Sequence, residues 1–134
     1  MIVRPLVAGR AEGELLLLSR PLSLWGGLDP EDGRITETTH PDVGRCVKGR
    51  LLAMEEARGS SSSASILVEA ARCGTAPAAI ILMRPDPILT IGSIVAELLY
   101  GVSIPIALVD ARDWPQLRDA AWIMLDGGRL KAGG

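Results

Sequence analysis

Four consecutive serines, Ser60 to Ser63, follow an Arg-Gly pair in the stretch "RGSSSSAS" and lead into an apolar run with helical spacing. Hydroxyl groups at a helix start have two physical uses. A serine oxygen can cap the helix by accepting a backbone N–H that has no intrahelical partner. A glycine-led first turn can also bind an anion, because its N–H groups lie at the positive end of the helix dipole. The pattern leaves both interpretations open.

A cation stands next to this turn. Arg58 directly precedes Gly59, and its guanidinium is suited to paired hydrogen bonds with a carboxylate or a phosphate. The serine turn with Arg58 is therefore a candidate site for a small anionic substrate.

Four residues in the loop before this turn have two interpretations each. His40, the one histidine, is a candidate general acid or else a loop histidine hydrogen-bonded to backbone. Gly26 and Gly27 either permit a tight turn or let the loop approach a substrate or partner. The adjacent Trp25 is expected to pack in the core rather than to anchor an interface.

The residues predict no metal site within this chain. Cys46 and Cys73 are far apart and lack metal-ligand spacing, so we expect two reduced structural thiols. Two thiols are also too few for an iron–sulfur cluster, which normally needs three or four.

The elements that must position the serine turn alternate between strand and helix. From Val47 to Val109 the order is strand, helix, strand, helix, strand, which predicts two βαβ units and a parallel core. Ligands gather where such strands end and helices begin, which is where the serine turn lies. The expected strands are 2–8, 11–19, a short one at 34–37, 47–55, 78–83, 103–109 and a hairpin over 121–132.

The helix boundaries are marked by capping residues. Gly74 is expected to end the serine helix, while Asp86 and Pro87 should begin the next one, which Gly101 ends. A short helical turn is expected in "DARDWPQLRD". On the second long helix one stripe is apolar, as in an amphipathic helix, and it consists of Ile88, Ile91, Ile94, Val95 and Leu98.

Length and composition exclude several classes of protein. The 134 residues are 48% apolar with a formal charge of −2, which is typical of one globular domain, residues 1–134. Aromatic residues make up 3% and no segment is strongly basic, so a nucleic-acid surface is not expected. No apolar run reaches membrane-spanning length, and no secretory signal begins the chain, so a cytoplasmic location is the default expectation.

Five motifs in order, "PLSLWGGLDPEDGRI", "THP", "RGSSSSAS", "GTAPAAIIL" and "PDPILTIGSIVAELLYG", together resemble the small subunit of the aconitase X family. The resemblance covers roughly residues 7–108. It implies an α/β fold, namely the swivelling β/β/α domain of aconitase with a parallel βαβαβ core plus added β-strands. It further implies pairing with a large aconitase X subunit, as a heterodimer or higher assembly. The large subunit would hold an iron–sulfur cluster, and this chain alone would bind no cofactor.

The resemblance also implies an activity, the removal of water from a small hydroxy acid. Ser60 matches the serine that abstracts a proton in the aconitase superfamily, while the partner's cluster, as a Lewis acid, removes the hydroxyl. Arg58, Gly59, Ser61 and Ser62 would then bind the substrate's carboxylate or phosphate.

The family has two known substrates. The serine-rich turn is more similar to the branch that dehydrates cis-3-hydroxy-L-proline. The alternative is a phosphomevalonate dehydratase small subunit, which converts mevalonate 5-phosphate to trans-anhydromevalonate 5-phosphate.

Two further functions compete with a dehydratase subunit. One is a non-catalytic swivel module that binds anions or regulates a partner. The other is a serine hydrolase, which is disfavoured because no Gly-x-Ser-x-Gly motif is present and only His40 is available as the base.

Overall fold

The centre of the molecule is a parallel sheet whose strands are connected by two helices. The computed structural model describes residues 1–134. The strand-helix alternation predicted from the sequence is confirmed, and β5 pairs with β6 and β6 with β7, all in parallel. The elements are β5 (Leu51–Met54), α2 (Ser63–Cys73), β6 (Ala79–Leu82), α3 (Pro87–Tyr100) and β7 (Ile106–Leu108).

Four more strands extend this sheet on both sides. They are β1 (Arg4–Val7), β2 (Arg10–Leu17), β8 (Trp122–Asp126) and β9 (Arg129–Gly133). The order is β1-β7-β6-β5-β2-β8-β9, with β2 parallel to β5 and the outer pairs antiparallel. The predicted C-terminal hairpin is confirmed.

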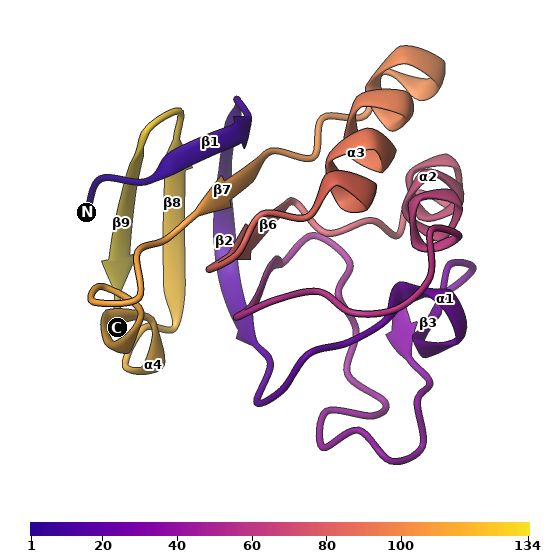
Figure 1. Cartoon of the computed structure of the whole chain (residues 1–134), viewed down its shortest axis with the longest axis horizontal. Coiled ribbons are helices and arrows are strands. Elements are labelled where there is room, and N and C mark those ends of the chain that lie inside the picture. Colours follow the sequence, from indigo (N-terminus) through magenta and orange to yellow (C-terminus); the bar gives the residue numbers. More distant parts are fainter.

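The two edges of the sheet meet, so the sheet is curled. The Val3 N–H donates to the Gly128 carbonyl at 2.9 Å, and the Leu130 N–H donates to the Met1 carbonyl at 2.9 Å. Figure 1 shows the result as layers, with the β8–β9 hairpin on one side of the central strands and α2 and α3 on the other. This arrangement is the expected α/β fold with strands added around a parallel core.

Side chains alternate between two cores along the central strands, as the two-residue period of a strand requires. On β5, Leu52 and Met54 enter a core under the helices, while Leu51 and Ala53 enter a second core inside the curl. Because both faces of these strands are buried, their sequences are apolar throughout. Trp114 and Leu117, beside and within the short helix α4 (Pro115–Arg118), help to fill the second core.

The predicted helix caps are confirmed. The Asp86 carboxylate accepts the Leu89 N–H at 2.9 Å, and Pro87 occupies the first turn of α3. Gly74 and Gly101 end α2 and α3 in the left-handed conformation, with φ of 75° and 66°. None of the helices is both long and apolar enough to cross a bilayer.

The buried face of α3 differs from an amphipathic arrangement. The side of α3 in the core is formed by small residues and one leucine, and the large apolar stripe is mostly exposed. The buried residues are Leu89, Gly92, Ser93 and Ala96, while Ile91, Ile94 and Leu98 of the stripe are exposed. The reason is close helix packing, because a Cβ at Gly92 would lie 3.1 Å from the Ala64 backbone of α2.

The long segment before β5 is a structured loop. It contains the single kinked turn α1 (Leu24–Gly27) and two short strands, β3 (Leu28–Asp29) and β4 (Arg34–Ile35), which pair with each other. The strand expected at residues 34–37 is therefore present but shorter. In Figure 1, α1 lies beside α2, and the two are in contact.

Candidate functional site

The serine turn lies between the carboxyl end of β5 and the start of α2, as expected. Its backbone requires glycine at Gly59, where φ is +108°. A Cβ at this position would lie 1.9 Å from the Ser23 Oγ and 2.5 Å from the Ser23 Cβ. Gly59 therefore serves to bring the turn against the loop that carries Ser23.

Within the turn, one hydroxyl is hydrogen-bonded to the helix start. The Ser60 Oγ accepts the backbone N–H of Ser62 at 3.1 Å, and the Ser60 carbonyl accepts the Ser63 N–H at 3.0 Å. Ser62 precedes the first helical residue, but its side chain forms no capping bond. The capping interpretation thus holds for Ser60 rather than for the residue at the cap position.

Several hydrogen-bond donors of the turn have no partner in the protein. The backbone N–H groups of Gly59, Ser60 and Ser61 donate to no acceptor in the chain, and Ser60 and Ser61 are exposed. Arg58 is also exposed and forms no ion pair, whereas Arg84 nearby is paired with Glu56 at 2.8 Å. The open end of α2 thus presents N–H groups and one cation, which suits an anionic ligand.

A clamp from the preceding loop fixes this end of α2. The buried Ser63 Oγ accepts the Trp25 N–H at 3.2 Å, and the Ser23 Oγ donates to the Trp25 carbonyl at 3.0 Å. Ser23 and Ser63 were not selected from the sequence as site residues. They are 40 positions apart along the chain, and only the glycine at position 59 indicated that another segment approaches the turn.

The two loop glycines make the clamp possible. Gly26 has a φ of +78°, and a Cβ at Gly27 would lie 2.9 Å from the Leu22 Cδ1. Both observations support the tight-turn interpretation. The packing interpretation of Trp25 is wrong, because its side chain is 56% exposed beside the serine turn.

His40 is a buried loop residue with both ring nitrogens engaged. It is 2% exposed; its Nδ1 accepts the Asp42 N–H at 3.0 Å, and its Nε2 lies 3.0 Å from the Arg20 carbonyl. Because the Asp42 N–H can only donate, the proton of the neutral ring is on Nε2. This geometry matches the interpretation of His40 as a loop histidine hydrogen-bonded to backbone. Through the Arg20 carbonyl, it holds the segment that leads to the clamp.

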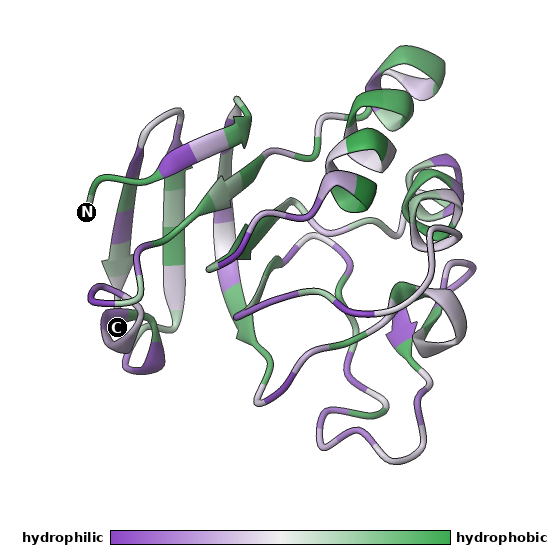
Figure 2. Cartoon of the chain, viewed as in Figure 1, coloured by the Kyte–Doolittle hydropathy of each residue, from purple (hydrophilic) through white to green (hydrophobic).

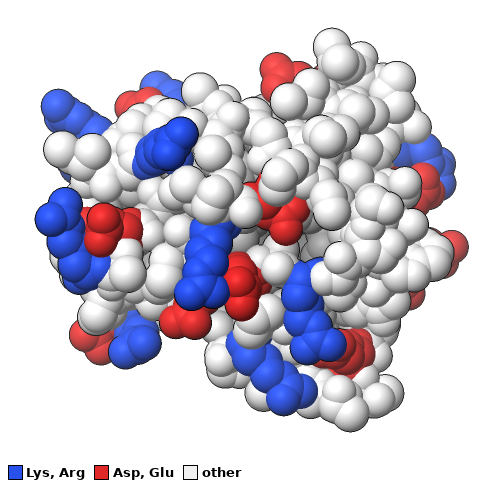
Figure 3. All heavy atoms as spheres, viewed as in Figure 1, with Lys and Arg blue, Asp and Glu red and all other residues white.

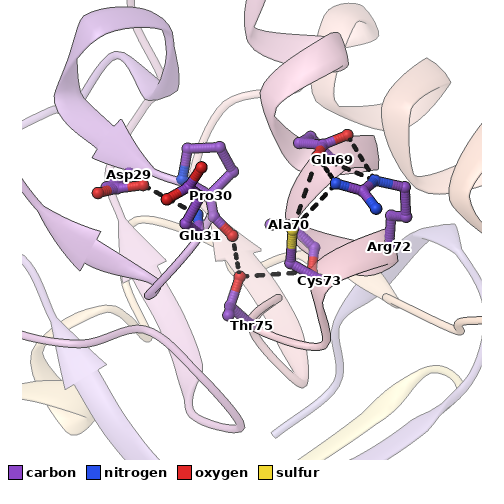
Figure 4. Close-up of polar contacts among 8 residues, drawn as sticks. All are labelled: Asp29, Pro30, Glu31, Glu69, Ala70, Arg72, Cys73 and Thr75. Carbon is purple, nitrogen blue, oxygen red and sulfur yellow. Dashed lines mark hydrogen bonds and ion pairs between the residues drawn. The ribbon is translucent and has the colours of Figure 1, made fainter.

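The opposite end of α2 is closed by contacts within the chain (Figure 4). The Thr75 Oγ1 donates to the Pro30 carbonyl at 2.6 Å and also reaches the Ala70 carbonyl. Arg72 binds Glu69 through two nitrogens, and this hydrogen bond lowers the pKa of the Glu69 carboxyl.

The cysteines do not fit a metal site. Both are free thiols: Cys46 Sγ donates to the Asp32 carbonyl at 3.4 Å, and Cys73 lies against Glu69. Desolvation raises the pKa of the Cys73 thiol, which favours the protonated form that does not bind metals. No three His, Cys, Asp or Glu side chains are grouped to hold a metal ion, so the residues of this chain do not fit the ligands of an iron–sulfur cluster.

The serine turn lies on an open surface rather than in a cavity. The largest hollow, of about 480 Å³, lies at the ends of β2 and β5 and is lined by Arg20, Glu55, Trp114 and Arg118 among others. None of the five principal hollows includes Gly59 to Ser62 in its lining. A second surface is therefore needed to enclose a substrate at the turn.

Comparison with known proteins gives consistent results. A family model described as the aconitase X swivel domain matches residues 1–132. The crystal structure of aconitase X from Thermococcus kodakaraensis in its holo-form superposes with a TM-score of 0.86 at 27% identity, covering 99% of this chain and 97% of that chain.

Two curated relatives differ in length. A cis-3-hydroxy-L-proline dehydratase from Pseudomonas aeruginosa is 47% identical over 98% of this chain, which spans only 22% of that protein. A phosphomevalonate dehydratase small subunit from Methanosarcina acetivorans is 30% identical over 92% of this chain and 83% of its own length. The chain thus corresponds to about a fifth of the first relative and to most of the second.

Proposed function

This chain belongs to the aconitase X swivel-domain family, and from that premise we propose that residues 1–134 act as one swivel domain of a dehydratase. Its role is to supply Ser60 as the base when a large subunit closes over the serine turn. The large subunit would hold the iron–sulfur cluster, since the cysteines of this chain do not fit one.

The observation that carries the proposal is the hydrogen bond from the Ser62 N–H to the Ser60 Oγ, at 3.1 Å. A serine hydroxyl is a poor base because its alkoxide is unstable in water. A backbone N–H donor, the N-terminus of α2 and the Arg58 cation all favour the anionic oxygen. In a closed site, one such preorganised donor is worth about 3 kcal/mol.

Binding and proton transfer then fall to different groups of the turn. The unpaired N–H groups of Gly59 and Ser61, with the hydroxyls of Ser61 and Ser62 and the Arg58 guanidinium, bind the substrate's carboxylate. Ser60 Oγ takes a proton from the substrate carbon next to the one that bears the hydroxyl. The electron pair left on that carbon forms the new C=C bond as the C–O bond breaks on the side of the large subunit, and the released hydroxide takes the proton from Ser60, so that water and an unsaturated product leave and the base is restored.

The substrate we propose is cis-3-hydroxy-L-proline, because the cis-3-hydroxy-L-proline dehydratase from Pseudomonas aeruginosa is 47% identical to this chain. Mevalonate 5-phosphate is the alternative, since a phosphate would satisfy the same N–H groups and Arg58. A non-catalytic anion-binding module is a second candidate function, favoured by the open N–H groups irrespective of any base.

Removal of the Ser60 hydroxyl tests the proposal. We expect Ser60→Ala to lower kcat by about 10²–10⁴-fold in the complex with the large subunit, prepared without oxygen. The assays are loss of cis-3-hydroxy-L-proline and, separately, of mevalonate 5-phosphate. Ser103→Ala, which removes an exposed serine outside the turn, is the matched control and should leave kcat unchanged.

Each result has a distinct meaning. Normal turnover by Ser60→Ala would exclude Ser60 as the base. A wild-type complex that turns over neither substrate, but in which the turn binds carboxylates or phosphate, would support the anion-binding module instead.

A further inference from the structure

The outer side of α3 is an apolar surface that the fold leaves uncovered. We call it the α3 face. Its side chains are 47–78% exposed, and they are Ile91, Ile94 and Leu98, which recur at helical spacing along one side. Figure 2 shows α3 as hydrophobic over most of its length. Contiguous apolar surface of this kind is uncommon on monomeric proteins and marks an interaction site.

Charge is almost absent from this part of the molecule. Among the 14 residues of α3, Glu97 is the one that carries a charge at neutral pH. In Figure 3 the surface over α3 is mostly white, whereas Lys, Arg, Asp and Glu gather over the strands and the long loop. A depletion of charge together with large apolar side chains is typical of the core of a stable protein interface.

The α3 face is continuous with the serine turn. Gly92 of α3 packs on Ala64, which is two positions after Ser62. Between the helices runs a groove of about 260 Å³, lined by residues of both helices. These are Ala64, Ser65, Val68, Glu69, Gly92 and Val95. A partner that covers the turn therefore meets this groove, and next to it the α3 face.

We propose that the α3 face and this groove form the docking surface for the large subunit. The inference rests on the proposed function, which requires a second protein surface over the serine turn. The Pseudomonas aeruginosa relative, of whose length this chain matches 22%, has further protein in the same polypeptide, and we expect that part to cover the same surface there. The complementary surface on the large subunit is apolar, with a side chain that enters the groove between α2 and α3.

Charged substitutions on the α3 face test this proposal. The double variant Ile94→Glu/Leu98→Glu places two carboxylates where the side chains are 47% and 78% exposed, so the free chain should keep the wild-type melting temperature. We expect its affinity for the purified large subunit, measured by calorimetry, to fall at least about tenfold. The matched control is Ile2→Glu, because Ile2 is 83% exposed in the N-terminal segment that pairs with β9. Its affinity should stay within about twofold of wild type.

Two results would overturn the proposal. One is wild-type affinity of the double variant for the large subunit. The other is a homodimer of this chain through α3 that persists when the large subunit is bound, which would make a second copy the occupant. Ser60→Ala separates this proposal from the catalytic one. If this variant binds the large subunit with wild-type affinity and retains turnover, Ser60 is not the base, but the proposed docking surface is unaffected.

Discussion

The two ends of α2 are built from similar small and polar residues, yet their backbone groups are satisfied in opposite ways. At the C-terminal end, Gly74 and Thr75 direct their N–H groups back to carbonyls of the last turn. The Thr75 hydroxyl then joins that end to Pro30. At the N-terminal end, the N–H groups of Gly59, Ser60 and Ser61 have no acceptor in the chain.

This difference separates a structural end from a binding end. A helix end that is saturated by its own chain adds stability but offers nothing to a ligand. The N-terminal end is also held by the preceding loop, through the clamp of Ser23, Trp25 and Ser63, but the clamp leaves its donors open. Such an end is rigid and unsaturated, which is what preorganised anion binding requires.

Alanine at the two positive-φ glycines that flank α2 gives the largest contrast. At Gly59, a Cβ would overlap Ser23 and φ is +108°, so Gly59→Ala should lower the free energy of unfolding by about 2–3 kcal/mol. Turnover should fall about 100-fold because the turn is displaced. At Gly74 a Cβ meets no atom within 4 Å, so Gly74→Ala should cost only about 1 kcal/mol.

Thermal or urea unfolding and steady-state kinetics of the assembled enzyme measure both quantities. Gly74→Ala is the control, with unchanged kcat. Equal losses of turnover in the two variants would show that the ends do not differ in role.

A smaller difference between the two ends of α2 is expected for their buried hydroxyls, those of Ser63 and Thr75. Ser63→Ala leaves the Trp25 N–H without its acceptor, and Thr75→Val removes the hydrogen bond to Pro30. Each should lower the free energy of unfolding by about 1–2 kcal/mol. We expect only Ser63→Ala to impair the enzyme, by roughly tenfold in kcat/KM, because it loosens the serine turn.

Unfolding and kinetic measurements on both variants decide the matter. If Thr75→Val lowered kcat/KM as much as Ser63→Ala, then stability in general, rather than the clamp, would account for the loss.

The smallest expected effect concerns the ion pair at the closed end. The hydrogen bond with Arg72 lowers the pKa of Glu69 below its ordinary value of 4.5. A carboxyl with a lowered pKa in the folded state stabilises the protein above about pH 4.5, and that contribution is lost as pH falls through the folded-state pKa. Glu69 is exposed enough for solvent to weaken the effect.

The melting temperature of Glu69→Gln should therefore lie slightly below that of wild type at pH 7, and the difference should shrink as the pH falls below 4.5. A difference in melting temperature that grew with acidification would contradict the assigned direction of the pKa shift.

Most of the fold could be predicted because its signals are local. Apolar runs with turn residues at their ends marked β5, β6 and β7, and Asp86, Gly74 and Gly101 marked the helix boundaries. The curl of the sheet was not predicted, because it depends on hydrogen bonds between Met1–Val3 and Gly128–Leu130, at opposite ends of the chain.

The candidate site was predicted only in part, for the same reason. Arg58 to Ser62 are consecutive, so one motif contained all of them. The clamp joins positions 23–25 to position 63, and no sequence pattern relates the two. Packing in the core was expected for Trp25, whereas the structure leaves it 56% exposed next to Gly26, where φ is +78°.

The sequence by itself determined the strand-helix order, the caps and the location of the serine turn at a helix start, because these depend on the conformational preferences of residues close together in the chain. Only the tertiary structure decided which helix face is buried and which turn is held open. On α3, the close approach that Gly92 permits to Ala64 buries the small residues and leaves Ile91, Ile94 and Leu98 outside. Burial is a property of the packed neighbours, and the neighbours of both helices come from distant segments of the chain.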